Sequence, residues 1–234
     1  MNHRLNDLGQ PIGQDIPGWN GAKPVEHTDL HGRTCDVVPL CESHAADLHA
    51  AFSLERTGAL WTYMPTGPFD AEADYAAWVR DACQSKDPLF FAIIDKSTGR
   101  PVGVASYLRI QPQNGVVEVG FITFSPLLQR RVAATEAMFL MMRHVFDDLG
   151  YRRYEWKCDA LNAASKKAAK RLGFRYDGLF KQALVYKGRN RDTAWFSILD
   201  NDWPEVRATF EDWLQPTNFD ADGQQITPLK IREP

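Results

Sequence analysis

Residues 116–135 read VVEVGFITFSPLLQRRVAAT, and this stretch decides the fold. In its first half apolar residues alternate with others, which predicts a β-strand that the Ser-Pro pair ends. Gln129 to Ala134 then begin a long helix, because apolar residues recur at helical spacing beyond them. The first N–H groups of a helix lack partners within it, and the helix dipole adds positive charge there. With Arg130 and Arg131 beside them, these groups predict a site for a phosphate-bearing ligand that needs no metal.

A second motif follows further along the chain, where Asn162-Ala-Ala-Ser165 begins a helix that ends in Leu-Gly-Phe174. The strand, the loop from Gln129 to Ala134 and this helix, in that order, resemble the GNAT superfamily of acyl-CoA-dependent N-acetyltransferases. The loop of that family reads Q/R-x-x-G-x-G/A. The resemblance extends over roughly Arg33 to Leu199 and is closest to the branch with the ribosomal-protein alanine N-terminal acetyltransferases. Val132 stands where the family usually has glycine.

The rest of the chain predicts an alternation of strands and helices. Strands are predicted at 33–40, 89–95, 101–109, 153–158, 174–179 and 194–199, and helices at 43–54, 71–84, 163–172 and 203–214. On the central helix, Ala137 and Met141 share an apolar face, and Glu136 is expected on the opposite side. The resemblance implies a GNAT-like α/β fold, with a mixed, mostly antiparallel central sheet flanked by helices and a splayed strand pair that holds CoA. We expect an irregular N-terminal arm at 1–30, a single acetyltransferase domain at 31–215 and a C-terminal tail at 216–234.

Composition narrows the classes of protein. Hydrophobic residues make up 44% of the 234-residue chain, enough for a large core. The 27 basic and 30 acidic residues give a net charge of −3, so nucleic acid is not expected as a partner, although the segment from Arg152 to Arg191 is basic. The four cysteines are scattered and do not suggest a disulfide framework. Neither a signal peptide nor a membrane span is evident, so we expect a cytoplasmic protein without a membrane partner.

The resemblance implies acetyl-CoA as co-substrate, without a metal. It places the pantetheine arm beside residues 118–124, where a bulge in the strand would free a backbone N–H for the thioester oxygen. The predicted cofactor-binding residues are Phe121, Ile122, Thr123, Gln129, Arg130, Arg131, Val132, Ala133, Ala134, Thr135, Asn162 and Ser165. A β-branched residue does not readily adopt positive φ, so Val132 is compatible with the site if it has ordinary helical dihedrals. Asn162 has a second role open to it, as the N-cap of its helix.

Two residues are predicted to be catalytic. Glu118 lies where the resemblance places an acidic residue that deprotonates the amine, which is mostly protonated at neutral pH. Its alternative role is to fix a neighbouring loop by hydrogen bonds. Ser165 is predicted to protonate the departing thiolate, because the position of the tyrosine found in many GNAT members is Ala169 here; direct protonation by water is the other possibility that this absence favours. Its alternative role is a capping contact, and Cys158 is expected to be a buried apolar residue rather than a nucleophile.

The acceptor is predicted to be a primary amine, either a small molecule or a protein N-terminus. Aromatic residues lie where family members shape the acceptor pocket, and the predicted substrate residues are Trp61, Tyr63, Phe69 and Tyr186. Their alternative role is packing in the core. The predicted function is acetyl transfer from acetyl-CoA by direct attack of the amine, and the resemblance allows a homodimer. The alternative is a non-catalytic CoA-binding sensor or interaction module on the same fold, which Val132 and the missing tyrosine suggest.

Overall fold

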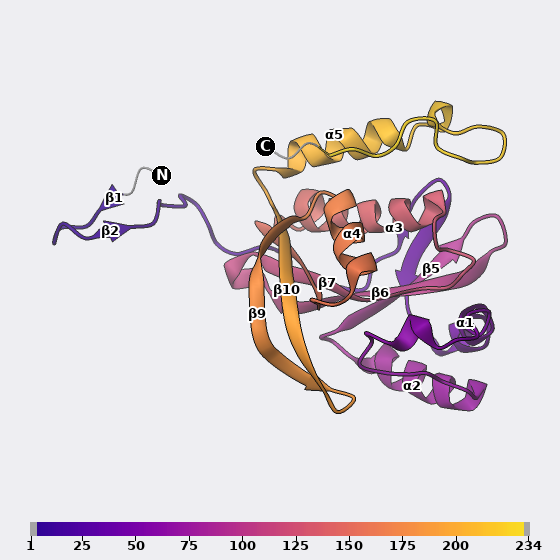
Figure 1. Ribbon diagram of the computed structural model, residues 1–234. Coiled ribbons are helices and arrows are strands. Elements are labelled where there is room, and N and C mark those ends of the chain that lie inside the picture. The colour runs from indigo at the N-terminus through magenta and orange to yellow at the C-terminus, as the bar shows by residue number, and fades with distance from the viewer. Residues whose placement is uncertain (1–3, 232–234) are drawn as a thin grey trace.

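An eight-stranded sheet forms the centre of the protein, in the computed structural model that describes residues 4–231 (Figure 1). Its strands lie in the order β3-β4-β5-β6-β7-β8-β10-β9, and neighbouring strands are antiparallel except β7 and β8, which are parallel. Their bounds are β3 Leu30–His31, β4 Cys35–Pro39, β5 Leu89–Asp95, β6 Arg100–Gln111, β7 Val116–Phe124, β8 Arg153–Asp159, β9 Arg175–Tyr186 and β10 Arg189–Leu199. The predicted mixed, mostly antiparallel sheet is therefore confirmed.

Helices cover both faces of this sheet. On one face lie α1 (Ala45–Phe52) and α2 (Glu72–Gln84), and on the other α3 (Val132–Arg143) and α5 (Trp203–Trp213), as Figure 1 shows. Between β8 and β9 in the chain is α4 (Ala163–Arg171), and α3 continues into a π-helical turn, His144–Asp148. The remaining described elements are the 3₁₀ turns Glu42–His44, Ala59–Trp61, Pro112–Asn114 and Pro216–Asn218, and a separate two-stranded sheet of β1 (Arg4–Leu5) and β2 (Pro11–Ile12). Within residues 4–231, no helix has the length and hydropathy needed to cross a bilayer.

The sheet separates two hydrophobic cores. The larger core lies between the sheet and α3 with α5, and it includes Val117, Val119 and Met141. The smaller core lies between the sheet and α1 with α2, and it includes Phe90 and Val104. Central strands are buried on both faces, which explains the nearly continuous apolar sequence of β5. The candidate site lies along β7, which borders both cores.

The position of Glu136 corrects one prediction about the central helix. Helical periodicity predicts this residue on the side away from the core, but only 5% of its surface is exposed. Its carboxylate accepts hydrogen bonds from the backbone N–H groups of Arg33, Thr34 and Cys35 at 2.8, 2.6 and 3.2 Å. The turn before β4 therefore packs on this side of α3. This packing also explains why β4 begins at Cys35, whereas the sequence predicted a strand that begins at Arg33.

The last hairpin differs from the predicted strands in length. The strand predicted at 174–179 continues to Tyr186, and its partner begins at Arg189 instead of Ala194. The sequence of β9 gives little sign of this, because β9 is an edge strand whose residues are almost all exposed. Its pairing with the buried β10 holds it in the sheet. The hairpin tip consequently reaches the loop between α1 and α2, which matters for the site.

Candidate functional site

A gap between β7 and β8 defines the candidate site. The two strands pair in parallel from Val116 and Arg153 as far as Val119 and Trp156. Beyond that point they no longer pair with each other, although both strands continue. Separated strands leave backbone groups that an extended ligand can pair with. The predicted splayed strand pair is therefore present in the structure.

A β-bulge lies at the beginning of this gap. Two residues of β7, Phe121 and Ile122, oppose the single residue Ala105 of β6. Phe121 has a φ of 49°, which is a left-handed conformation. Its ring packs in the smaller core, 5.1 Å between centroids from the ring of Phe90, whereas Ile122 packs against the larger core. A bulge interrupts the ladder and leaves an extra residue unpaired, so backbone groups here are available to a ligand.

The start of α3 provides a second set of free backbone groups. In the loop before it, the N–H groups of Gln129 and Arg131 bond to earlier carbonyls of the loop. Within residues 4–231, the N–H groups of Arg130, Val132 and Ala133 have no hydrogen-bond acceptor. The side chains of Arg130 and Arg131 are exposed and form no ion pair with any described residue. Three unused donors and two free cations therefore gather at this helix start, which is the arrangement that binds phosphate.

Val132 fits this site without glycine. It is the first residue of α3, so its backbone is helical, and the positive φ of the loop, 61°, falls on Arg130. The side chain of Val132 is half-buried against the larger core. The condition for a β-branched residue at this position, ordinary helical dihedrals, is therefore met.

Asn162 and Ser165 lie at the start of α4, just after the free end of β8. The Asn162 side chain accepts a hydrogen bond from the Ser165 N–H at 3.0 Å and so acts as the N-cap of α4. The Ser165 hydroxyl accepts a hydrogen bond from Nε1 of Trp156 at 2.9 Å, which leaves its own proton available to a further acceptor. Burial raises the pKa of the neighbouring Cys158 thiol, and a hydrogen bond with Ser165 opposes that change. Cys158 is 6% exposed, which agrees with its predicted buried role.

Glu118 belongs to a buried chain of charges on the α1 and α2 face of the sheet. Its carboxylate accepts a hydrogen bond from Nη1 of Arg109 at 2.6 Å and from Nζ of Lys157 at 2.9 Å. Lys157 also contacts Glu155 at 2.7 Å, and Glu155 contacts Arg153 at 2.6 Å. The side chains of Glu118 and Lys157 are each only 4% exposed. Glu118 therefore joins β6, β7 and β8, and its partners lie on strands and not in a neighbouring loop.

Burial and charge act on Glu118 in opposite directions. Burial disfavours the charged carboxylate and raises the pKa of Glu118, while Lys157 and Arg109 partly offset this effect. Glu155, on the other side of Lys157, is also disfavoured as a carboxylate by burial. Its hydrogen bonds from Lys157 and Arg153 outweigh this effect and lower the pKa of Glu155. The two glutamates share one lysine yet differ in proton affinity. Glu118 is the one that binds a proton more readily.

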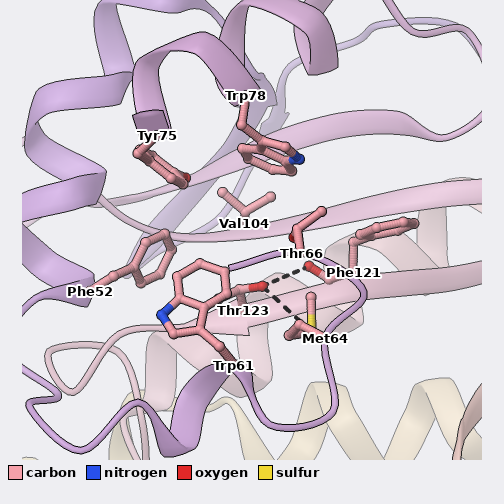
Figure 2. Close-up of a pocket in the computed structure, with 9 residues that line it drawn as sticks. All are labelled: Phe52, Trp61, Met64, Thr66, Tyr75, Trp78, Val104, Phe121 and Thr123. Carbon is pink, nitrogen blue, oxygen red and sulfur yellow. Dashed lines mark hydrogen bonds between the residues drawn. The ribbon is translucent and has the colours of Figure 1, made fainter. Parts of the chain in front are cut away.

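An aromatic pocket lies between the bulge of β7 and helices α1 and α2 (Figure 2). Its walls come from α1, α2, the segment 61–66, β6 and β7. The lining residues are Phe52, Trp61, Met64, Thr66, Tyr75, Trp78, Val104, Phe121 and Thr123. Of the predicted substrate residues, Trp61 lines this pocket, and Phe69 packs behind it with its ring centroid 5.2 Å from that of Trp61.

The β9–β10 hairpin holds the segment 61–66 over this pocket. Nζ of Lys187 donates hydrogen bonds to the carbonyl oxygens of Trp61 and Thr66 at 2.9 and 3.0 Å. Arg189 donates to the Thr62 carbonyl at 2.6 Å. These contacts cross from the far edge of the sheet to the loop between α1 and α2.

Tyr63 and Tyr186, the other predicted substrate residues, do not line the pocket and instead lie near the free end of β8. The Tyr63 hydroxyl donates to the Leu161 carbonyl at 3.3 Å, and the Tyr186 hydroxyl donates to Oδ2 of Asp159 at 2.8 Å. Burial, followed by this bond to Asp159, raises the pKa of Tyr186 to about 12, so its phenol stays protonated at neutral pH. The predicted substrate residues therefore lie in two places: Trp61 and Phe69 at the aromatic pocket, and Tyr63 and Tyr186 near the free end of β8.

Four residues of the site were not predicted from the sequence: Arg109, Lys157, Asp159 and Tyr75. A signal for two of them is present in β8, where every second residue is charged, namely Arg153, Glu155, Lys157 and Asp159. Such alternation places the charges on one face of a strand. It does not reveal that this face is buried, and Tyr75 has no comparable signal.

Comparison with known proteins gives consistent relatives. The family model described as acetyltransferase (GNAT) domain matches residues 36–175. The crystal structure of a GCN5-related N-acetyltransferase from Brucella melitensis is 46% identical, with a TM-score of 0.89, and the match covers 92% of this chain and 97% of that one. A probable acetyltransferase of the GNAT family from Chromobacterium violaceum ATCC 12472 is 36% identical, with a TM-score of 0.77 over 83% of this chain and 98% of that one.

A more distant solved structure shares the fold. It is an acetyltransferase from Salmonella typhimurium that modifies the N-terminal serine of a 50S ribosomal subunit protein. It is 21% identical, with a TM-score of 0.63 over 74% of this chain and 99% of that one. The chain belongs to the GNAT acetyltransferase family, whose members use acetyl-CoA as acetyl donor. The resemblance predicted from the sequence is confirmed.

Proposed function

We propose that this protein is an N-acetyltransferase that binds acetyl-CoA in the gap between β7 and β8 and transfers the acetyl group directly to a primary amine. The observation that carries the proposal is the start of α3, with its three unused N–H groups and two unpaired arginines. A diphosphate bound there is stabilised by charge-assisted hydrogen bonds and by the helix dipole. The pantetheine arm then extends along β7 and brings the thioester to the bulge at Phe121.

In the proposed reaction the neutral amine attacks the thioester carbonyl carbon. The C–N bond forms, negative charge moves to the carbonyl oxygen, and a backbone N–H between Phe121 and Thr123 stabilises it. The C–S bond then breaks, and Ser165 donates its proton to the sulfur and regains one from water. Glu118 accepts the proton that the ammonium loses before attack and releases it to solvent, and the second proton that the nitrogen loses once the C–N bond has formed passes through water to reprotonate Ser165. The other predicted contacts are Gln129, Ala134, Thr135 and Asn162 along the cofactor.

The environment of Glu118 supports its role as base. A carboxylate in bulk water takes a proton from an ammonium poorly, and burial makes proton binding easier by raising the pKa of Glu118. Arg109 and Lys157 hold its carboxylate in one orientation from two strands. Ser165 is supported by its bond to Trp156, which fixes the hydroxyl oxygen as acceptor and leaves the proton to be donated, to the Cys158 sulfur without ligand and to the CoA sulfur once it is bound.

The proposal is tested by release of CoA thiol from acetyl-CoA across a panel of primary amines and of peptides with free N-termini. We expect release that depends on the amine. Glu118→Gln should lower kcat by about 100-fold or more, a typical loss for a general base, without weakening CoA binding. Glu155→Gln is the matched control, because Glu155 is also buried, with 8% of its side chain exposed against 4% for Glu118, and shares Lys157. Equal losses in the two variants would assign Glu118 a structural role, and inactivity of the folded wild type on the whole panel would refute the proposal.

A second candidate function is a CoA-binding sensor without turnover. The observation that favours it is the pairing of Glu118 with two cations in this structure, which occupies the carboxylate. Calorimetric titration shows whether the protein binds CoA, and the thiol-release assay then distinguishes the enzyme from the sensor. Binding together with amine-dependent turnover supports the enzyme, and binding without turnover supports the sensor. Absence of binding would contradict both.

A further inference from the structure

The first described residues form a hairpin that lies apart from the rest of the domain. Strands β1 and β2 pair in a sheet of their own, and Figure 1 shows them clear of the eight-stranded sheet and its helices. Large apolar side chains of this segment are exposed, at Leu5, Leu8 and Ile16, and Leu8 is 82% exposed. A two-stranded hairpin is at best marginally stable alone in water. The projecting arm, residues 4–18, therefore offers apolar surface that its own domain leaves uncovered.

The projecting arm leaves the domain at a fixed point. Nε1 of Trp19 donates a hydrogen bond to the Gln113 carbonyl at 2.9 Å, and the Arg152 guanidinium lies over the Trp19 ring, 5.5 Å from its centroid. Gly115 makes room for this ring, because a Cβ at this position would lie 2.6 Å from it. Trp19 therefore anchors the projecting arm and sets the place on the domain from which it extends.

Strand β9, at the edge of the large sheet, is a second uncovered apolar surface. Of the thirteen large apolar side chains that are exposed between residues 4 and 231, five lie on β9 and three on the projecting arm. An edge strand without a partner is usually protected by proline or by several charges, but β9 has no proline and, after Leu179, only one charged residue, Lys181. Exposed apolar patches of this kind mark interaction surfaces. The five residues of β9 are Tyr176, Leu179, Phe180, Leu184 and Val185, of which Val185 is 81% exposed.

The projecting arm and β9 lie on the same side of the molecule. Arg152 contacts Trp19, and the next residue, Arg153, donates a hydrogen bond to Asp177 of β9 at 2.5 Å. Figure 1 shows both features on the left of the domain. In a pair with two-fold symmetry the same surface of each copy meets itself, so an arm and the surface that receives it must share one side. This arrangement meets that condition and closes with two copies.

Length and charge are compatible with the same pairing. From Trp19 to Gly9 at the hairpin turn, the extended chain reaches at most about 35 Å, and the twelve residues of β9 span about 40 Å. The projecting arm of one copy is thus long enough to follow most of β9 of another. Residues 4–29 include four acidic and two basic residues, whereas residues 152–191 include twelve basic and three acidic ones. Opposite charges of this kind favour the encounter of the two surfaces.

We propose that this protein pairs with a second copy of itself, and that the projecting arm of each copy packs against β9 of the other. The apolar side chains of the projecting arm and of β9 then leave water together, which is the main favourable change in such an association. The same contact occurs twice in each pair because of the two-fold symmetry. The inference is independent of the proposed acetyl transfer.

Sedimentation velocity of the full chain measures the pairing. We expect the wild type to sediment as a dimer of the 26.5 kDa chain at micromolar concentration. The arm variant, Leu5→Asp with Leu8→Asp, should raise the dissociation constant by about 100-fold or more, because two leucines lose their burial in each copy. Val185→Asp should weaken the pairing in the same direction. A wild type that stays monomeric up to its solubility limit would refute the proposal.

Leu54→Asp with Ile226→Asp is the matched control for the arm variant. It adds the same two charges at positions that are also exposed and apolar but lie outside the projecting arm and β9. All the substituted side chains are exposed, so thermal unfolding should show that every variant is folded. The control should pair like the wild type. Equal weakening in the control and the arm variant would overturn the assignment of the surface.

A mixing experiment tests which surfaces meet. When the arm variant pairs with the Val185→Asp variant, one of the two contacts joins an unaltered arm to an unaltered β9. Each variant alone has two impaired contacts. The mixture should therefore contain more dimer than either variant does at the same total concentration. A mixture with no more dimer than the separate variants would refute the exchange of arms between copies.

Discussion

Replacing Val132 by proline removes one N–H from the start of α3 without disturbing a bond that the fold uses. In residues 4–231 this N–H has no acceptor. Proline is favoured at the first position of a helix, where its fixed φ fits and the missing N–H costs nothing. The residue before it must be extended, and Arg131 already has a φ of −94° and a ψ of 157°. The fold of the Val132→Pro variant should therefore persist.

The effect on CoA binding is expected to be large. A hydrogen bond to a charged acceptor contributes about 1.5–3 kcal/mol. Since each 1.4 kcal/mol is tenfold in affinity, loss of one such bond to a diphosphate should weaken CoA binding by about 10- to 100-fold. Calorimetric titration of CoA measures this directly, and thermal unfolding without ligand checks the fold.

Val132→Ala is the control, because it keeps the N–H and removes most of the side chain, which is half-buried against the larger core. It should bind CoA within about twofold of the wild type, since a bond retained leaves affinity nearly unchanged. If the proline variant is folded and binds CoA as tightly as the alanine variant, the main-chain donor at this position does not hold the cofactor. That result would refute the reasoning about the helix start.

Three further predictions concern charged residues. Burial raises the pKa of Glu118, and a base must be deprotonated, so kcat/KM should fall as the pH drops through a value above the usual pKa of glutamate, about 4.3. A pH–rate profile should show this fall at higher pH in Arg109→Met, which lacks one stabilising cation, and should not show it in Glu118→Gln. Lys157→Met leaves Glu118 and Glu155 without their shared cation, so urea unfolding should show a loss of about 3–5 kcal/mol, and a loss below 1 kcal/mol would contradict the buried pairing. Glu136→Gln should cost about 1.5–3 kcal/mol of unfolding free energy while CoA affinity stays the same, since its partners are backbone N–H groups of the turn before β4.

Much of the fold could be predicted because the decisive stretches have clear periodicity. The alternation in β7 and the helical spacing after it lie beside strong turn residues, and β5 was predicted with its observed bounds, Leu89–Asp95. The hairpin of β9 and β10 was predicted too short, because an exposed edge strand needs no apolar alternation. Glu136 was misplaced because periodicity identifies one packed face of a helix and does not register a turn that covers the other.

The site was predictable in its cofactor half and less so in its acceptor half. Backbone donors at a helix start follow from the helix itself, so the loop from Gln129 to Ala134 could be identified from sequence. The buried pairing of Glu118 with Lys157 depends on the register of two parallel strands, which no local pattern specifies. Tyr75 lies on α2, distant in sequence from β7, and only the packing of α2 on the sheet brings it to the bulge.

The central claim is that main-chain N–H groups at the start of α3 hold the diphosphate of CoA. The most direct measurement is the change in backbone amide resonances of the isotope-labelled protein on addition of CoA. We predict large shifts for Arg130, Val132 and Ala133, whose N–H groups are unused, and smaller shifts for Gln129 and Arg131, whose N–H groups already bond within the loop. Saturation with CoA that leaves the first three resonances in place would contradict the claim.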